Sequence, residues 1–336
     1  MKKIVISFVV CFLLVFCPLT SLFAAASLPS SVDWTNCLPT PMAQQQNDCT
    51  ACASAYALMT MEQKIRRGWT LDDGAGDTKI FSPSYTFNKQ NWSNGTGAIS
   101  LIMMSSYVSD GACPKSYFPY TTNTSIMPTD IQNAAASLYK ASGEYLVAGI
   151  SQMKTRLANG EGIIISFRLY QDFLKMSAVN NVYDSYDYLP NGGTPNTSYG
   201  STYHTVCLIG YDDNAYGGAF KFINSYGSSW VEGGYGWVTY NWLPTACAMK
   251  VGNIPLGIRT PVLSTDDYIL GDINEDGSVT AADARLALRY SVGLETPTAR
   301  QYVLADVNGD SYVNSTDAWA INQFATGLIT TMPLYD

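Results

Sequence analysis

Residues 46–67 read QNDCTACASAYALMTMEQKIRR, a short polar turn followed by a pattern that is typical of an amphipathic helix. Apolar side chains recur at intervals of three and four, which is the spacing of one helix face: Ala55, Leu58, Met61 and Ile65. Asp48 stands before the start, where helices favour short polar caps, and Gly68 follows the basic last turn. We therefore predict a helix over residues 52–67 that begins at Cys52.

The elements expected after this helix change character at Gly162. Before it, apolar spacing predicts further helices over residues 98–108 and 150–157. After it, runs of β-branched and aromatic residues predict strands over residues 163–167, 203–211, 219–224 and 235–242. Helices first and a sheet second indicate an α+β fold rather than alternating strands and helices.

The composition indicates a large globular chain with an acidic carboxyl-terminal segment. Of 336 residues, 47% are hydrophobic, which is enough for a sizeable core and for more than one domain. The net charge is −8, and from Asp266 onward the chain has 11 acidic residues and 3 arginines. Since this balance offers no basic surface to neutralise phosphates, we expect no nucleic-acid partner. The acidic segment is better suited to binding cations than to binding anions.

Residues 1–26 have the pattern of a secretory signal peptide. Lys2 and Lys3 precede an apolar run over residues 4–16, and alanines occupy positions 24–26. The apolar run is shorter than a membrane span, which disfavours an uncleaved anchor. We expect a secreted, extracellular protein with no membrane contact after signal removal. Six cysteines remain beyond residue 26, and disulfides are permitted outside the cell, but the spacing does not select a pairing.

His204 is the single histidine of the chain, so a catalytic scheme that needs an imidazole base depends on it. Cys52 lies at the expected start of a helix, where aligned amides and the helix dipole favour a thiolate. Asn224 follows His204 by 20 residues at the end of another expected strand, where its amide would hold the imidazole in one tautomer. Cysteine, histidine and asparagine in this order predict a hydrolase in which a cysteine thiolate is the nucleophile. The alternatives for Cys52 are a core residue, a disulfide half or, with Cys49, a redox pair or half of a zinc site.

Motifs in this order resemble the papain family of cysteine peptidases. Residues 28–34 resemble the opening of the mature family members, and residues 46–52 resemble their Gln-Gly-x-Cys-Gly-Ser-Cys segment. Residues 204–211 resemble the family's histidine strand, and residues 224–236 resemble its Asn-Ser-Trp-Gly segment. The resemblance covers roughly residues 28–254. It implies a papain-like fold, in which a helical subdomain packs against a β-barrel-like subdomain.

The resemblance also implies catalytic roles. It assigns Cys52 as the nucleophile and His204 as the general base and acid. Asn224 is then the orienting amide, and Gln46 is the oxyanion-hole donor. The expected reaction is peptide-bond hydrolysis by a thiolate, with no catalytic cofactor. The chain departs from the family pattern at Ala53 and Tyr226, where Trp is usual, and the nearest counterpart of the substrate-binding Gly-Gly lies at residues 95–97. Because Leu28 follows the signal almost directly, we expect no N-terminal inhibitory prosegment.

Two loops of the acidic segment, 34 residues apart, carry oxygen ligands at positions 1, 3, 5, 7, 9 and 12. The first loop uses side chains and, at position 7, a carbonyl, from Asp272, Asn274, Asp276, Ser278, Thr280 and Asp283. The second loop repeats the pattern with Asp306, Asn308, Asp310, Tyr312, Asn314 and Asp317. Hard oxygen ligands at these intervals suit calcium, so we expect two structural calcium ions. Helices are expected after the loops, over residues 281–292 and 315–326.

The loop-then-helix repeat, with Asp rather than Glu at position 12, disfavours a calcium-sensing EF-hand pair and resembles a type I dockerin. The resemblance implies a small all-α module that docks onto a cohesin of a cellulosome-type scaffold. By the family pattern, positions 10 and 11 contact the cohesin, and these are Ala281, Ala282, Ser315 and Thr316. We expect a slight apolar core, built from Leu286, Leu288, Trp319, Ile321 and Phe324.

These assignments divide the chain into a signal peptide (1–26), a peptidase domain (27–255), a linker (256–267) and a dockerin (268–336). The leading prediction is a secreted cysteine endopeptidase that is attached to an extracellular scaffold and acts on polypeptide substrates. One alternative is a catalytically weak or inactive papain-like domain that serves as a scaffold-docked binding or structural protein. Another is an amidase or acyl-transfer enzyme that acts on non-protein substrates.

Overall fold

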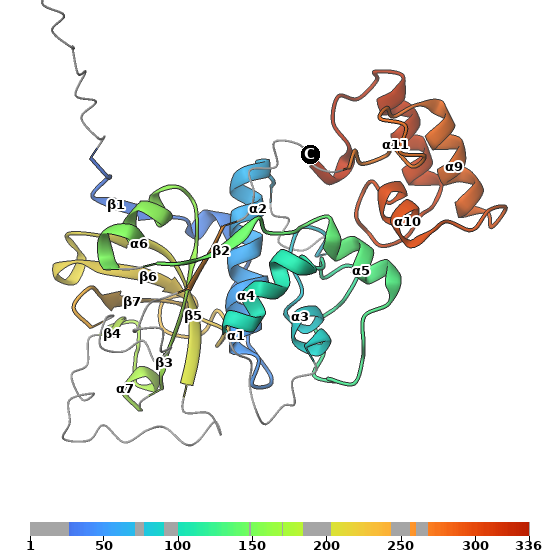
Figure 1. Ribbon diagram of the computed structural model, residues 1–336. Helices are drawn as coiled ribbons and strands as arrows, with labels where there is room; N and C mark the ends of the chain where they lie inside the picture. Colours follow the sequence, from blue (N-terminus) through green and yellow to red (C-terminus); the bar gives the residue numbers. More distant parts are fainter. Residues whose placement is uncertain are drawn as a thin grey trace, which may run out of the picture.

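The computed structural model describes residues 27–70, 77–90, 100–147, 149–169, 171–183, 203–242, 256–259 and 268–335. The expected signal peptide, residues 95–97 and Cys247 lie outside the described residues. Figure 1 shows a sheet, a group of helices beside it, and a separate all-helical unit formed by the carboxyl-terminal residues. The predicted α+β fold followed by a small all-α module is confirmed.

One long helical segment of the peptidase domain lies between the sheet and a group of shorter helices (Figure 1). That segment runs from residue 49 to residue 67 as α1 (Cys49–Ala51), the π-helical η2 (Cys52–Met59) and α2 (Thr60–Arg67). The other described helices of this domain are η1 (Thr35–Cys37), α3 (Pro83–Lys89), α4 (Ser100–Ser109), α5 (Asp130–Ser137), α6 (Gly149–Ala158), α7 (Gln171–Leu174) and η4 (Ala215–Gly217).

The long helical segment begins one turn earlier than predicted. Residue 49, not residue 52, is its first helical position, and the Cys52 backbone N–H already donates to the Asp48 carbonyl at 2.9 Å. Residues 52–63 are buried all round, because the segment lies between the sheet and helices α3 and α4. Gly68 ends it with φ of +69°, a left-handed conformation that glycine adopts without strain.

The sheet has the strand order β2-β8-β3-β5-β6-β7-β4, with β1 paired to β5. The strands are β1 (Ser31–Asp33), β2 (Gly143–Leu146), β3 (Ile163–Arg168), β4 (Val182–Tyr183), β5 (Tyr203–Asp212), β6 (Ala219–Ile223), β7 (Tyr235–Thr239) and β8 (Leu256–Arg259). β3, β5, β6 and β7 confirm the strands expected from the sequence. The central pairs β3–β5 and β5–β6 are antiparallel, so the start of β5 lies close to the end of β6.

Residues 256–259 correct the predicted domain boundary. They were assigned to the linker, but they form β8, which pairs with β2 and β3 in the peptidase sheet. The peptidase domain therefore extends to Arg259 at least. Pairing between β8 and strands more than ninety residues earlier in the chain leaves no local trace in a four-residue segment, which explains the error.

Two apolar clusters hold the peptidase domain together, one on each side of the sheet. The first fills the space between the long helical segment and the other helices, with Trp69, Phe81 and Tyr107 fully buried. The second lies among the strands and α6, with Phe167 and Phe222 fully buried. Among the described residues, no helix is long and apolar enough to cross a membrane.

The dockerin unit contains α9 (Ala281–Ser291), α10 (Ala299–Ala305), α11 (Ser315–Ala325) and η5 (Pro333–Tyr335). α9 and α11 confirm the predicted helices. The three α-helices begin with reciprocal capping boxes, in which Thr280, Thr298 and Asn314 are the caps. The predicted core is wrong at Leu288 and Trp319, which are 48% and 61% exposed. The observed core consists largely of small residues and short apolar ones: Ala284, Ala287, Ala305, Ala318, Ala320, Ile273, Val307 and Ile321.

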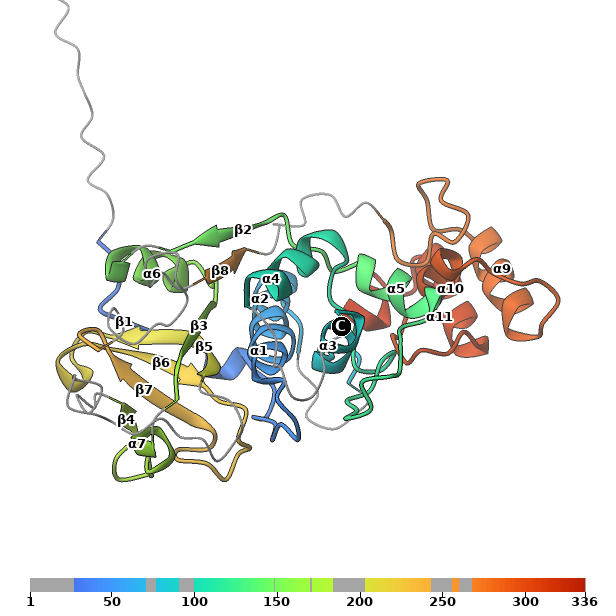
Figure 2. The same ribbon diagram turned by 60° about the horizontal axis from the view of Figure 1, so that its bottom comes forward.

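The dockerin lies against the helical side of the peptidase domain. Both views place α10 beside α5 (Figures 1 and 2), and these helices are in contact. The Tyr117 hydroxyl donates a hydrogen bond to Asp306 Oδ2, and Arg67 Nη2 donates to the Tyr268 hydroxyl at 3.3 Å. Asp306 is position 1 of the second expected calcium loop, so this loop is part of the contact between the two domains.

Candidate active site and calcium loops

His204 and Asn224 meet at the point where β5 starts and β6 ends. His204 Nε2 lies 2.7 Å from Asn224 Oδ1, as the sequence predicted. The imidazole is 3% exposed and contacts the rings of Phe167 and Phe173. The Tyr226 ring covers it at a centroid distance of 4.8 Å. An aromatic residue therefore shields the His204–Asn224 contact here as a Trp does in the family pattern.

Burial decides the charge of the imidazole. It lowers the pKa of His204 to about 4, and the hydrogen bond with Asn224 opposes this shift only in part. Asn224 Oδ1 is an acceptor, so Nε2 carries the proton and Nδ1 keeps its lone pair. Oδ1 also accepts the Ser225 backbone N–H at 2.8 Å, which fixes the amide. The pair thus presents a neutral base with a defined tautomer.

Cys52, the predicted nucleophile, is turned toward a carboxylate. Its sulfur lies 3.6 Å from Asp48 Oδ1, and the residue is 2% exposed. Burial first, and then the charges of Asp48 and Cys49, raise the pKa of the Cys52 thiol well above its usual value. Beside Cys52 lies a small cavity with room for about one water molecule, lined also by Thr205 and Asn224.

Cys49 lies at the first position of the helix and closer to the surface. Its sulfur accepts hydrogen bonds from the backbone N–H and the hydroxyl of Thr205, the residue that follows His204 in β5. Burial raises the pKa of the Cys49 thiol, and the Thr205 donors oppose that shift. A chain of hydroxyls continues from here, since Thr205 Oγ1 lies 3.0 Å from Thr50 Oγ1 and 2.9 Å from Ser166 Oγ.

Gln46, the predicted oxyanion-hole donor, faces away from Asn224. Its Nε2 donates to Asp48 Oδ2 and to the Thr121 carbonyl, both at 3.3 Å. Gln44 faces the other way: its Oε1 accepts the Ser225 hydroxyl at 2.5 Å, and its backbone N–H donates to the Ser225 carbonyl at 2.8 Å. Three consecutive glutamines precede the helix, and a motif read from sequence does not reveal which of them reaches the strand that carries Asn224.

The remaining cysteines described by the structure do not form disulfides. Cys37, Cys49, Cys52, Cys113 and Cys207 are free thiols in the described part of the chain. Cys113 and Cys207 are fully buried in the apolar interior, and burial raises their pKa well above the usual value. They are core residues.

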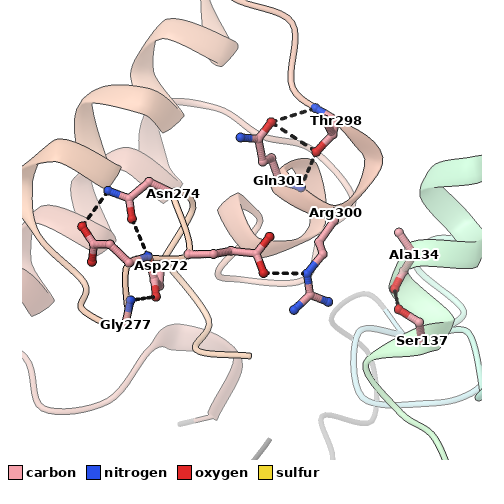
Figure 3. A network of polar contacts seen from close by, with 10 residues as sticks. Ala134, Ser137, Asp272, Asn274, Gly277, Thr298, Arg300 and Gln301 are labelled. Atoms are coloured by element: carbon pink, nitrogen blue, oxygen red, sulfur yellow. Dashed lines mark hydrogen bonds and ion pairs between the residues drawn. The ribbon is translucent and has the colours of Figure 1, made fainter. Parts of the chain in front are cut away.

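The two calcium loops are formed, and their carboxylates are buried. The first and last aspartates of each loop are at most 4% exposed: Asp272, Asp283, Asp306 and Asp317. Backbone N–H groups occupy many of their oxygens, as in Figure 3, where the Asp272 carboxylate accepts the Gly277 N–H at 2.9 Å. In the described residues, no three His, Cys, Asp or Glu side chains converge into a metal-binding group.

The second loop shows why a cation suits these residues. Burial, followed by the charge of Asp317, raises the pKa of Asp306 to about 7, although Tyr117 and backbone donors oppose this. Burial and the charge of Asp310 raise the pKa of Asp317 to about 6. These carboxylates repel one another in a site that excludes water, and hard oxygen donors in this state fit a calcium ion. The residues present therefore fit the expected ion.

The other expected ligands lie in the same loops. Ser278 and Tyr312, whose carbonyls are the expected position-7 ligands, donate their backbone N–H groups to Asp276 and Asp310, and the Tyr312 carbonyl accepts Asn314 Nδ2 at 3.5 Å. The position-9 residues, Thr280 and Asn314, also cap α9 and α11. At position 6, Gly277 has φ of +91° and Ser311 has φ of +70°, so the second loop places a non-glycine residue in the left-handed conformation. Asn274 and Asn308 donate to Asp276 and Asp310, respectively.

The expected cohesin-contact residues lie on the surface. All four are exposed in the first turns of α9 and α11: Ala281, Ala282, Ser315 and Thr316. Large apolar side chains on the same helices are also exposed, namely Leu288, Val292 and Trp319. The two helix starts are therefore both exposed but differ in chemistry, with two alanines in α9 and two hydroxyl side chains in α11.

Comparison with known proteins identifies both domains. The papain family cysteine protease model matches residues 28–253, and the dockerin type I domain model matches residues 270–324. Fruit bromelain of Ananas comosus is 24% identical over 219 residues, which cover 62% of this chain and 54% of bromelain. The chain therefore spans about half the length of this curated relative.

Solved structures show the same peptidase fold. Xylellain, a cysteine protease from Xylella fastidiosa, superposes with a TM-score of 0.55 at 21% identity, covering 70% of this chain and 88% of xylellain. Bromelain from Ananas comosus gives a TM-score of 0.52 at 18% identity, covering 70% of this chain and all of that one. The chain belongs to the papain family of cysteine proteases and carries a type I dockerin, a calcium-binding domain.

Proposed function

We propose that this protein is a secreted cysteine endopeptidase that is held on an extracellular scaffold through a calcium-dependent dockerin–cohesin contact. The observation that carries the enzymatic part is the 2.7 Å contact between His204 Nε2 and Asn224 Oδ1, beside the cysteines that begin the long helix. The papain family membership supports hydrolysis of peptide bonds rather than another use of the thiol. The secretory pattern of residues 1–26 supports export.

The arrangement of His204 determines the proposed mechanism. Because Nε2 donates to Asn224, Nδ1 accepts the proton of a cysteine thiol as the sulfur attacks the scissile carbonyl carbon. The negative charge that develops on the carbonyl oxygen is stabilised by a glutamine amide and by a backbone N–H at the helix start. The imidazolium then gives its proton to the leaving amine, and a thioester remains. Water hydrolyses the thioester, with His204 acting again as base.

Substitution of the His204–Asn224 pair tests this mechanism. We expect His204→Ala to abolish nearly all turnover of a peptide library without unfolding the chain. Asn224→Ala removes a buried hydrogen bond that contributes about 1–3 kcal/mol, which corresponds to a loss of roughly tenfold to a hundredfold in kcat/KM. Asn214→Ala, at an exposed asparagine, is the matched control and is expected to have no effect. Full activity in folded His204→Ala would contradict the proposal.

The same assay separates the alternatives. A scaffold-docked binding protein would bind peptides without cleaving them. An amidase or acyl-transfer enzyme would leave the library intact while releasing ammonia or exchanging the acyl group of small amides. Cleavage of internal peptide bonds supports the endopeptidase.

For the dockerin we propose that two calcium ions are held by the oxygen donors of the two loops and that a cohesin binds the starts of α9 and α11. Calcium would supply the positive charge that the buried aspartates of each loop lack. The exposed residues at positions 10 and 11 of each repeat support the docking surface, with Leu288 and Trp319 available beside them.

Introducing charge at the helix starts tests the docking surface. We expect Ala281→Asp with Ala282→Asp to weaken cohesin binding, measured by calorimetry with a dockerin-matched cohesin. The equivalent pair Ser315→Asp with Thr316→Asp reports whether the second repeat contributes equally. Unchanged affinity in a variant that carries all four substitutions would contradict the proposed surface.

A further inference from the structure

We propose that Cys49, rather than Cys52, is the nucleophilic thiol that works with His204. This inference rests on the proposed peptidase function and deepens it by naming the attacking atom. The Gln-x-x-Cys-x-x-Cys motif contains both cysteines, and its usual alignment selects the second. The structure separates them by position, access, hydrogen-bond partners and backbone pairing.

The first argument is position relative to His204. The Cys49 sulfur is hydrogen-bonded to the backbone N–H of Thr205, which belongs to the peptide unit directly after His204. Its place in the structure is therefore fixed to the strand that carries the base. Cys52 lies three residues further along the helix, and its sulfur has Asp48 as its hydrogen-bond partner instead of the strand that carries His204.

The second argument is access for the substrate. A scissile carbonyl carbon must reach the sulfur to form the thioester bond. Cys49 is half-buried, so part of it faces solvent, whereas Cys52 is 2% exposed. Cys52 is packed within η2, whose residues are all buried. A peptide would have to displace the surrounding chain to contact the Cys52 sulfur.

The third argument concerns the groups around each sulfur. The Cys52 thiol donates to Asp48 Oδ1, so a thiolate at Cys52 would face a carboxylate at 3.6 Å. That carboxylate is held in place by hydrogen bonds from the Tyr120 hydroxyl at 2.9 Å and from Gln46 at 3.3 Å. The charge of Asp48 also acts on Cys49, but the Cys49 sulfur is the acceptor of two Thr205 donors, and such donors favour the anionic form of a thiol.

The fourth argument concerns the oxyanion. The Cys52 N–H is already donated to the Asp48 carbonyl at 2.9 Å, so it is not available to a carbonyl oxygen of the substrate. Cys49 is the first helical residue, and the N–H groups of a first turn have no partner within the helix. Gln44 is fixed against Ser225, next to Asn224, and its Nε2 donates one N–H to the Gln46 carbonyl at 2.8 Å, which leaves the second N–H of the amide for the same oxyanion. Cys49, His204, Asn224 and Gln44 then form one group.

The experiment combines labelling with substitution in the full-length chain. An epoxysuccinyl peptide, which alkylates an activated thiol, is added to the wild-type protein with calcium, and the modified cysteine is identified by peptide mass mapping. We expect the label on Cys49. In parallel, Cys49→Ala is expected to lower kcat/KM by at least about a thousandfold, whereas Cys52→Ala stays within about tenfold of wild type.

The outcomes separate this inference from the proposed function. Label on Cys52, or activity retained in Cys49→Ala and lost in Cys52→Ala, overturns the Cys49 assignment and leaves the peptidase intact. A folded wild-type protein that neither takes the label on either cysteine nor cleaves any peptide overturns the peptidase function and this inference together. Mapping the label on the wild-type chain does not depend on whether the alanine variants fold.

Discussion

The peptidase domain and the dockerin bury polar groups in opposite ways. In the peptidase domain the buried polar side chains around the long helix are mostly uncharged, such as Ser54, which donates to the Thr50 carbonyl at 2.6 Å and lies 2.8 Å from the Tyr107 hydroxyl. In the dockerin the deeply buried polar side chains are aspartates. Neutral hydrogen-bonded groups need nothing from outside, whereas buried like charges require a counter-ion.

The apolar cores of the two domains also differ, in the size of their buried side chains. Large aromatic side chains such as Trp69, Phe81 and Phe167 are fully buried in the peptidase domain. The dockerin core contains five alanines among its buried residues. Since burial of apolar area contributes about 25 cal/mol per Å², small side chains contribute little. We therefore expect the peptidase domain to fold on its own core and the dockerin to need bound ions for folding.

Removing calcium is the largest expected perturbation of this comparison. At a calcium concentration a thousand times the Kd, each bound ion stabilises the folded state by about 4 kcal/mol. We expect excess chelator, or Asp272→Ala with Asp306→Ala, to unfold the dockerin and to weaken cohesin binding by at least about a thousandfold. Peptidase activity should change little. Glu275→Gln, at an exposed loop residue that pairs with Arg300 and is not a ligand, is the matched control.

Differential scanning calorimetry of the full chain measures this effect as two transitions. The dockerin transition should disappear with chelator, and the peptidase transition should remain at its temperature. A dockerin that melts identically with calcium and with excess chelator would show that its small core is sufficient.

The next largest effect is expected at the oxyanion glutamine. Loss of one oxyanion donor usually lowers kcat by about a hundredfold or more. Because Gln44 is fixed to Ser225 and Gln46 is engaged with Asp48, we expect this loss in Gln44→Ala and less than a tenfold loss in Gln46→Ala. Steady-state kinetics on a peptide substrate measures both. A larger loss in Gln46→Ala than in Gln44→Ala would assign the oxyanion-hole role to Gln46, as the sequence motif does.

The pH dependence of kcat/KM is expected to reflect the burial of His204. A base is active above its pKa, and burial lowers the pKa of His204 to about 4. At pH 5 about 90% of such an imidazole is neutral, compared with about 3% for an unperturbed histidine, a difference of roughly thirtyfold. We therefore expect near-full activity at pH 5 and an acid limb near pH 4. An acid limb near pH 6.5, with circular dichroism showing a folded chain, would contradict the burial argument.

The smallest expected effect is at the contact between the two domains. Tyr117→Phe removes the hydroxyl that donates to Asp306 and frees this oxygen for the ion. A hydrogen bond to a charged group contributes about 1.5–3 kcal/mol, so calcium affinity of the second loop should rise by about tenfold or somewhat more. Calcium titration calorimetry on the full chain measures it. Tyr290→Phe, at a partly buried tyrosine of α9 that lies outside both loops, is the control. Unchanged affinity in Tyr117→Phe would show that the two interactions do not compete.

The sequence predicted the elements whose signals are local. The central strands, α9 and α11, and the His204–Asn224 pair all lie where the pattern of residues placed them. It missed α5 and α10, although Thr129 with Gln132 and Thr298 with Gln301 form capping boxes that a search for such pairs would have found.

What the sequence did not reveal depends on long-range packing. The strand β8 is defined by its partners rather than by its own residues. The helix start moved by one turn because the chain around Asp48 is fixed by Tyr120 and Gln46 rather than by a side-chain cap. Helical spacing also did not show that Leu288 and Trp319 face outward, because a docking surface and a core have the same apolar period.

The Tyr117–Asp306 contact gives one carboxylate of the second loop a partner in the catalytic domain. The same carboxylate that would hold the second ion also accepts the hydrogen bond from the catalytic domain, so ion binding and this contact would be linked. An ion in the second loop would therefore weaken the contact with Tyr117, and the contact would lower the affinity of the loop for the ion.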